Sequence, residues 1–210
     1  MRELILFGVL AATYLMVIAK RVPALIRSFR YQSFFIFLIT LAAGYTEKQI
    51  SLYFIAALIL ALKVFVIPYV LNLIAKKISV EENLGLFVNA QLSLIVALAL
   101  TYCSRVFSET LGFGMDYRLA AVTVAFSVIF IGAFLMISRM KAFTQIIGLL
   151  VMENGIFLFA SFVTGGMPFF VEIAVFLDVF VSVIIMGLFI YRVNKLFTHI
   201  DVNKLSSLKG

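Results

Sequence analysis

Three ionisable residues lie deep inside long apolar runs of the sequence. Lys63 stands within LYFIAALILALKVFVIPYVLNLI, Glu153 within GLLVMENGIFLF and Asp178 within VEIAVFLDVFVSVIIMG. A charge at the centre of a bilayer costs at least about 2.5–3.5 kcal/mol on the insertion scale. An apolar environment disfavours the charged form, so such groups can exchange protons near neutral pH, as a proton relay requires. We therefore take all three as candidates for ion translocation.

Other interpretations of these charges stay open. Lys63 and Asp178 could form a static pair that fixes helix packing without moving an ion. Glu172 lies about one turn after the turn TGGMP, and it is either a fourth ion-path residue or an ordinary hydrogen-bonding side chain. The sequence alone does not choose between a moving relay and a static clamp.

Four further residues are expected to shape the helices that carry these charges. Gly148 and Gly155 are seven positions apart, so they share one helix face and allow a close helix–helix contact. Asn154 lies between Glu153 and Gly155 in that helix. Pro68 follows Lys63 by just over one turn, and its missing N–H frees a backbone carbonyl and permits a kink.

The composition is that of an integral membrane protein. Of the 210 residues, 64% are apolar and 13% are charged, whereas soluble domains have roughly 45–50% and about 25%. The net charge of +7 is better explained by membrane topology than by nucleic acid, and we expect lipid around the chain and no nucleic-acid partner. One cysteine and one histidine exclude a disulfide framework and a cysteine-ligated iron–sulfur cluster built from this chain. We expect no cofactor or metal in it, so any redox chemistry belongs to partner subunits.

The elements that must position the charges are transmembrane helices, because the apolar runs are long and do not alternate. We predict an all-α fold with seven spans, and the second is the weakest because it is short and lies between Arg30 and Glu47. The N-terminal run has its positive charges after it, which indicates a retained first span and not a secretory signal. The predicted spans are 3–19, 31–46, 49–75, 84–105, 118–138, 142–164 and 168–191.

The distribution of basic residues predicts the orientation. One side of the membrane receives Lys20, Arg21, Arg27, Arg30, Lys76, Lys77, Arg139, Lys141, Arg192, Lys195, Lys204 and Lys209, and the other receives Arg2, Lys48, Arg105 and Arg118. Because the cytoplasmic side carries the excess of Lys and Arg, we expect the N-terminus outside and the C-terminus in the cytoplasm. The chain then divides into a three-helix unit (1–82), a fourth helix with an external loop (83–117), a second three-helix unit (118–197) and a cytoplasmic tail (198–210).

Several short motifs resemble a known family. LVMENG at 150–155, VEI at 171–173, LDV at 177–179, the tail DVNKLSSLKG at 201–210 and KVFVIP at 63–68 are similar to segments of the hydrogenase-4 component E family. The last three predicted helices also resemble the K-type subunit of complex I and the C-type subunit of multisubunit cation/proton antiporters. Those subunits carry acids in their second and third helices, which correspond here to Glu153 and Asp178. The K-type subunit places its first acid about one turn earlier, where this chain has Leu150.

The resemblance implies a non-catalytic subunit of a complex-I-like group 4 nickel–iron hydrogenase in a prokaryotic inner (plasma) membrane. Partner subunits would be antiporter-like and anchor membrane proteins together with the hydrogenase large and small subunits. These partners would hold the nickel–iron centre and the iron–sulfur clusters, while this chain takes part in proton or sodium translocation. The alternatives are a purely structural scaffold of the membrane arm and an independent small ion transporter.

Overall fold

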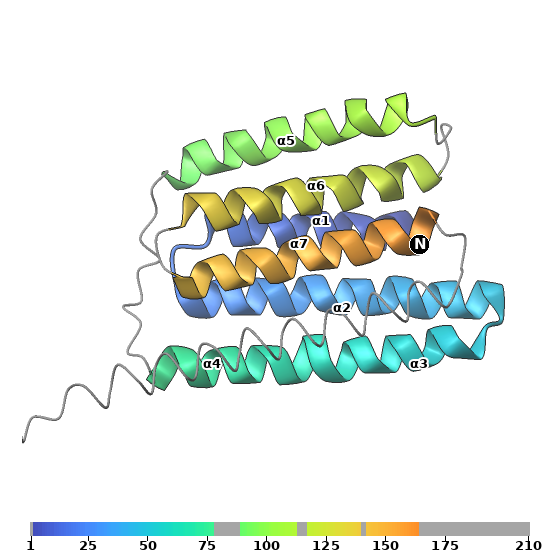
Figure 1. The fold of residues 1–210 in the computed structure, drawn as a ribbon, viewed down its shortest axis with the longest axis horizontal. Helices are drawn as coiled ribbons and strands as arrows, with labels where there is room; N and C mark the ends of the chain where they lie inside the picture. The colour runs from blue at the N-terminus through green and yellow to red at the C-terminus, as the bar shows by residue number, and fades with distance from the viewer. Residues whose placement is uncertain (1, 78–88, 113–116, 140–141, 164–210) are drawn as a thin grey trace, which may run out of the picture.

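The computed structural model describes residues 2–77, 89–112, 117–139 and 142–163. Within these residues the regular structure is helical throughout, and the helices lie side by side in one bundle (Figure 1). The elements are α1 (Arg2–Ile18), α2 (Val22–Glu47), α3 (Ile50–Ile59), a π-helical segment η1 (Leu60–Val66), α4 (Ile67–Lys77), α5 (Ala90–Thr110), α6 (Tyr117–Ser138) and α7 (Ala142–Val163).

Among the described residues, five helices are long and apolar enough to cross a membrane: α2, the continuous helix formed by α3, η1 and α4, and α5, α6 and α7. Helix α1 has 17 residues, which at 1.5 Å per residue span about 25 Å of the ~30 Å hydrocarbon core. The predicted third, fifth and sixth spans coincide closely with described helices. The predicted seventh span, the acids Glu172 and Asp178 on it, and the tail 198–210 lie outside the described residues.

Two predicted boundaries differ from the structure. Helix α2 begins at Val22 and not near residue 31, because Arg27 and Arg30 both lie on its exposed side and do not interrupt it. Pro23 stands in the first turn of this helix, where a missing N–H is tolerated. Helix α5 runs from Ala90 to Thr110, later than the predicted 84–105.

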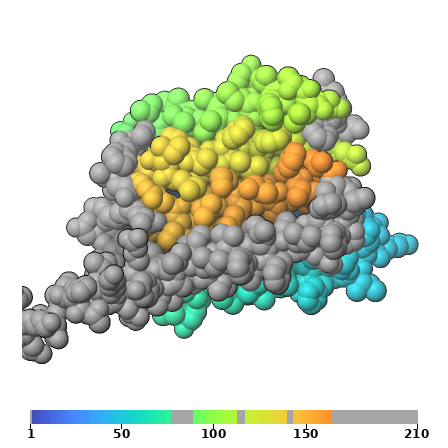
Figure 2. Space-filling view, viewed as in Figure 1, coloured from blue at the N-terminus to red at the C-terminus, as the bar shows by residue number. Residues whose placement is uncertain are grey.

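Helix α7 packs along α6 and also contacts α2. On the face shown in Figure 2, helices α5, α6 and α7 lie next to one another. Three glycines bring α6 and α7 together: a Cβ on Gly132 would lie 2.6 Å from the backbone nitrogen of Met152, and one on Gly148 would lie 2.9 Å from that of Met136. A Cβ on Gly155 would lie 2.8 Å from the backbone nitrogen of Ile129. Such small residues allow helix backbones to approach closely.

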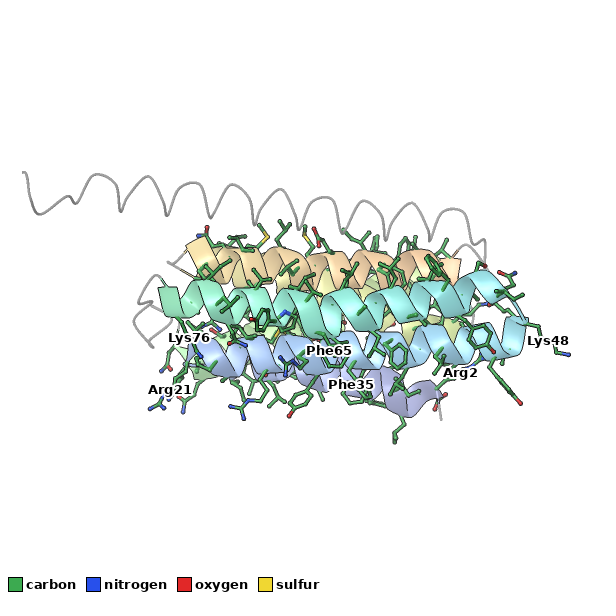
Figure 3. The ribbon with its side chains drawn as sticks, turned by 90° about the horizontal axis from the view of Figure 1, so that it is seen from below. Arg2, Arg21, Phe35, Lys48, Phe65 and Lys76 are labelled. Atoms are coloured by element: carbon green, nitrogen blue, oxygen red, sulfur yellow. The ribbon has the colours of Figure 1, made fainter. Side chains whose placement is uncertain are left out.

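The two ends of the bundle carry different basic residues. Figure 3 shows Arg21 and Lys76 at one end, and Arg2 and Lys48 toward the other. Lys48 forms the sharp connection from α2 to α3 in a left-handed conformation, with φ of 53°. The structure thus separates these four residues into the same two groups as the predicted topology, whereas the orientation in a membrane stays a prediction.

Arg139 directly follows α6 and binds the C-terminal end of α1. Its side chain is 1% exposed and donates hydrogen bonds to the carbonyl oxygens of Met16 (3.1 Å), Val17 (3.0 Å) and Ala19 (3.3 Å). The last carbonyls of a helix have no partner within it, and a cation there also opposes the negative end of the helix dipole. Burial lowers the pKa of Arg139 from its usual value to about 10. A residue that the sequence pattern assigns to topology therefore also caps α1.

Candidate functional site

Lys63 lies in the π-helical segment η1 and is 4% exposed. The N–H of Ile67 bonds to the carbonyl oxygen of Leu62, five residues back, which is the π-helical spacing. Pro68 comes next and can donate no N–H into this turn. A π-helical segment inside an α-helix is rare and is frequently found at functional sites. The proline thus accompanies a local widening of the helix at the buried lysine.

The Lys63 side chain reaches from η1 to α7. Its Nζ atom donates a hydrogen bond to Oδ1 of Asn154 at 2.9 Å, and Asn154 is fully buried. The same Nζ atom lies 5.8 Å from the centroid of the Phe157 ring, one turn further along α7. A cation at this distance from an aromatic face is attracted by the ring quadrupole. An amide oxygen and an aromatic ring of α7 thus both contact the end of the Lys63 side chain.

The hydrogen bonds continue from Asn154 across two more helices. Asn154 Nδ2 donates to Gln32 Oε1 at 3.0 Å and approaches Ser33 Oγ at 3.4 Å, both on α2. Gln32 Nε2 donates to Thr13 Oγ1 on α1 at 2.8 Å, and the Thr13 hydroxyl donates to the carbonyl oxygen of Val9 at 2.8 Å. We call the side chains of Thr13, Gln32 and Asn154 the amide arm; each of them is 0% exposed.

The amide arm has a fixed direction. The Thr13 hydroxyl uses its proton on Val9, so its oxygen must accept from the amide nitrogen of Gln32. The carbonyl oxygen of Gln32 then faces the amide nitrogen of Asn154, and the carbonyl oxygen of Asn154 faces Lys63. Amide groups do not take up or release protons near neutral pH, so protons do not pass along this arm. The arm ends at the hydrogen bond between Asn154 Oδ1 and Lys63 Nζ.

Glu153 precedes Asn154 in α7 and is 9% exposed. Successive residues of an α-helix project about 100° apart, so the carboxylate and the amide leave α7 in different directions. Gly155 follows them and faces α6 at Ile129. Three consecutive residues of α7 thus differ in their surroundings. Glu153 is a buried acid, Asn154 binds Lys63, and Gly155 packs closely against α6.

Of the residues that the sequence analysis singled out, Lys63 and Asn154 are in direct contact in the structure. It places Pro68 beside the π-helical segment, and Gly148 and Gly155 in the contact with α6. The pair of Lys63 with Asp178 stays a prediction, because Asp178 lies outside the described residues. Within the described part of the chain, no group of three or more His, Cys, Asp or Glu could hold a metal ion.

Sequence reasoning missed Thr13, Gln32, Ser33 and Phe157. The signal that could have found Gln32 is a glutamine inside an apolar helix, since a buried amide needs hydrogen-bond partners. Placing the helix start near residue 31 put Gln32 at a span end, where water would satisfy it. With α2 beginning at Val22, Gln32 lies well inside the helix and Thr13 becomes its partner.

No protein-family model matches the chain, and no solved structure matches it. An uncharacterized protein of Mycobacterium tuberculosis is 28% identical over 204 residues, covering 96% of this chain and 93% of that protein. The hydrogenase-4 component E of Escherichia coli is 29% identical over 176 residues, covering 81% of this chain and 79% of that protein. The same figures hold for the hydrogenase-4 component E of Shigella flexneri. The chain is thus similar over most of its length to a component of a hydrogenase.

Proposed function

We propose that this protein is a member of the hydrogenase-4 component E family and a non-catalytic membrane subunit of a complex-I-like, energy-converting hydrogenase complex. Similarity to component E over 81% of the chain supports the family and the complex. Helices that are long and apolar enough to span a membrane support a place in its membrane arm. In this proposal, electron transfer occurs at the nickel–iron centre and iron–sulfur clusters of partner subunits.

The single observation that carries an ion-handling role is the buried amine of Lys63. Lys63 lies 13 residues after Ile50 and 14 before Lys77, so it is about 20 Å from either end of its helix. The side chain does not extend that far, and the charge is not returned to water by snorkelling. Ionisable residues that are kept at such depth mark ion and proton pathways. We assign Lys63, Glu153, Asp178 and Glu172 to the translocation of protons or sodium ions.

The amide arm favours a second role, that of a scaffold. It joins α1, α2 and α7 to η1 through side chains that do not exchange protons near neutral pH. The two roles are compatible if the arm holds one side of Lys63 while the ammonium group exchanges on another side. In the purely structural alternative, Lys63 never changes charge.

The test uses the intact complex in inverted membrane vesicles. We expect Lys63→Met, Glu153→Gln and Asp178→Asn to keep dye-linked hydrogenase activity and assembly but to abolish the ion gradient. Lys76→Met is the matched control for the lysine, since Lys76 is exposed near the end of the same helix. Glu109→Gln is the control for the acid, because Glu109 is 48% exposed.

Each alternative gives a different result. A full gradient in all three variants would refute ion handling by these residues. Dissociation of the complex on blue-native electrophoresis would instead indicate the structural scaffold. Purification of the chain as a homo-oligomer without hydrogenase subunits would indicate an independent transporter.

A further inference from the structure

A pocket of about 160 Å³ opens near one end of the bundle. It lies where α1 begins, α2 ends, α6 begins and α7 ends, and among its lining residues are Arg2, Glu47, Tyr117 and Arg118. This is the end that carries the N-terminus (Figure 1). A pocket of this size with several polar side chains has room for several water molecules.

The rim of the pocket is held by Arg2. Its guanidinium donates to Thr46 Oγ1 at 2.5 Å on α2 and lies 5.9 Å from the centroid of the Tyr117 ring on α6. The Arg2 side chain, from α1, therefore contacts both α2 and α6 at the rim. The rim thus carries the charged side chains of Arg2, Glu47 and Arg118.

Two hydroxyl groups also line the pocket. Thr40 on α2 and Ser161 on α7 both contribute to the lining. Thr40 Oγ1 donates to the carbonyl oxygen of Ile36 at 3.0 Å, and Ser161 Oγ donates to that of Leu158 at 2.8 Å. Each hydroxyl uses its proton within its own helix, so each oxygen is left as an acceptor for water.

Phe157 lies between this pocket and Lys63. It lines the pocket, is 2% exposed, and its ring centroid is 5.8 Å from Lys63 Nζ. Ser161 follows it by about one turn of α7 on the pocket side, and Asn154 precedes it by about one turn on the lysine side. An apolar constriction between two polar regions stops water by dewetting, which is how hydrophobic gates work.

We propose that the pocket is a water-filled access chamber leading to Lys63 and that the Phe157 ring is its gate. The inference rests on the proposed ion-handling role of Lys63 and specifies the route. With the ring in place, chamber water is separated from Nζ. When the ring turns aside, one proton passes between Nζ and a chamber water, and Lys63 alternates between ammonium and amine.

The experiment compares two conservative Ser→Cys substitutions on either side of the ring. Ser161→Cys reports on the chamber, and Ser33→Cys reports on the lysine side, because Ser33 Oγ is 3.4 Å from Asn154 Nδ2. Both are made in the intact complex in native membranes with the exposed Cys103 replaced by Ala. A charged, membrane-impermeant methanethiosulfonate reagent is applied from each side of the membrane in turn, so no orientation is assumed.

We expect rapid modification of Ser161→Cys from one side and no modification of Ser33→Cys while Phe157 is present. Replacing Phe157 by Ala, or by Leu if the alanine variant does not assemble, should speed modification of Ser33→Cys at least tenfold. Phe159→Ala is the control on the same helix, since the Phe159 ring packs 4.9 Å from that of Phe126 on α6. It should leave both rates unchanged.

Failure to modify Ser161→Cys from either side would overturn the chamber. Modification of Ser33→Cys with Phe157 in place, or a rate that neither Phe157 variant changes, would overturn the gate. Thiol modification requires neither hydrogen turnover nor an ion gradient. Its result therefore stands apart from the gradient measurements that test the proposed function.

Discussion

Asn154 Oδ1 accepts a hydrogen bond from Lys63 Nζ at 2.9 Å, although the two residues are 91 positions apart in the chain. Neither group has access to bulk water, since Lys63 is 4% exposed and Asn154 is 0% exposed. Leaving a buried donor or acceptor without a partner costs about 1–3 kcal/mol, and more when the group is charged. The hydrogen bond of the buried Lys63 Nζ atom therefore depends on the position of α7 relative to η1.

The amide arm should behave as one unit in stability. Gln32→Leu and Asn154→Leu each break the hydrogen bond between the two residues, and each should lower the thermal unfolding midpoint of the solubilised complex. The double variant should lose about 0.5–3 kcal/mol less than the sum of the single variants, as expected for residues in one network.

Thr101→Val supplies the control for this cycle. Thr101 Oγ1 bonds to the Tyr14 hydroxyl at 2.6 Å, separately from the amide arm. Combined with Gln32→Leu, its effect should add. Strict additivity of the Gln32 and Asn154 substitutions would show that the arm is not an energetic unit.

The contact between α6 and α7 makes Gly155 sensitive to a single methyl group. Gly155→Ala would place Cβ 2.9 Å from the carbonyl oxygen of Ala125 and against the backbone of Ile129, and backbone atoms cannot rotate away. Overpacking of this kind typically costs 1–3 kcal/mol. We expect a lower unfolding midpoint and a weakened hold on Lys63.

Gly44→Ala is the matched control, because its nearest contact would be Leu52 Cβ at 3.3 Å. At this distance a shift of a few tenths of an ångström is enough, so the unfolding midpoint should change much less. Equal losses in the two variants would contradict the close backbone contact at Gly155.

Individual site residues could be predicted from the sequence, but most of their partners could not. Lys63 and Asn154 stand in apolar runs, and the cost of burying a polar group is a local property that the sequence reveals. Which atom satisfies Lys63 depends on the rotation of η1 and α7 about their axes, and no sequence period fixes that. Gln32 was missed because Arg30 suggested a membrane boundary, whereas α2 keeps this arginine on its exposed side and runs on to Val22.

Arg139 should stabilise the protein through hydrogen bonding to the end of α1. Arg139→Met leaves the carbonyl oxygens of Met16, Val17 and Ala19 without this donor, and a buried acceptor that loses its partner costs about 1–3 kcal/mol. We expect a clear drop in the unfolding midpoint. Arg105→Met should cause little change, because its ion pair with Glu109 is exposed and such pairs contribute about 0–1 kcal/mol.

The effect of Arg139→Met should not depend on pH between about 6 and 9. Burial lowers the pKa of Arg139 to about 10, so the guanidinium stays charged in folded and unfolded chains throughout this range. Only above about 10 would the folded state bind fewer protons than the unfolded state, and this group's contribution to stability would then rise with pH. A difference that changes steeply between pH 6 and 9 would contradict this assignment.

Pro68 should matter for function more than for stability. Pro68→Ala restores an N–H donor just after η1 and allows the helix to return to α-helical spacing. A return of this turn from π-helical to α-helical spacing, with the residue count unchanged, rotates Lys63 by about 100° relative to α4, which takes Nζ away from Asn154. We expect the ion gradient of the proposed complex to fall severalfold while dye-linked hydrogenase activity is unchanged. Pro23→Ala, in the first turn of α2, should leave both unaffected, and a full gradient with Pro68→Ala would show that Lys63 does not need the π-helical segment.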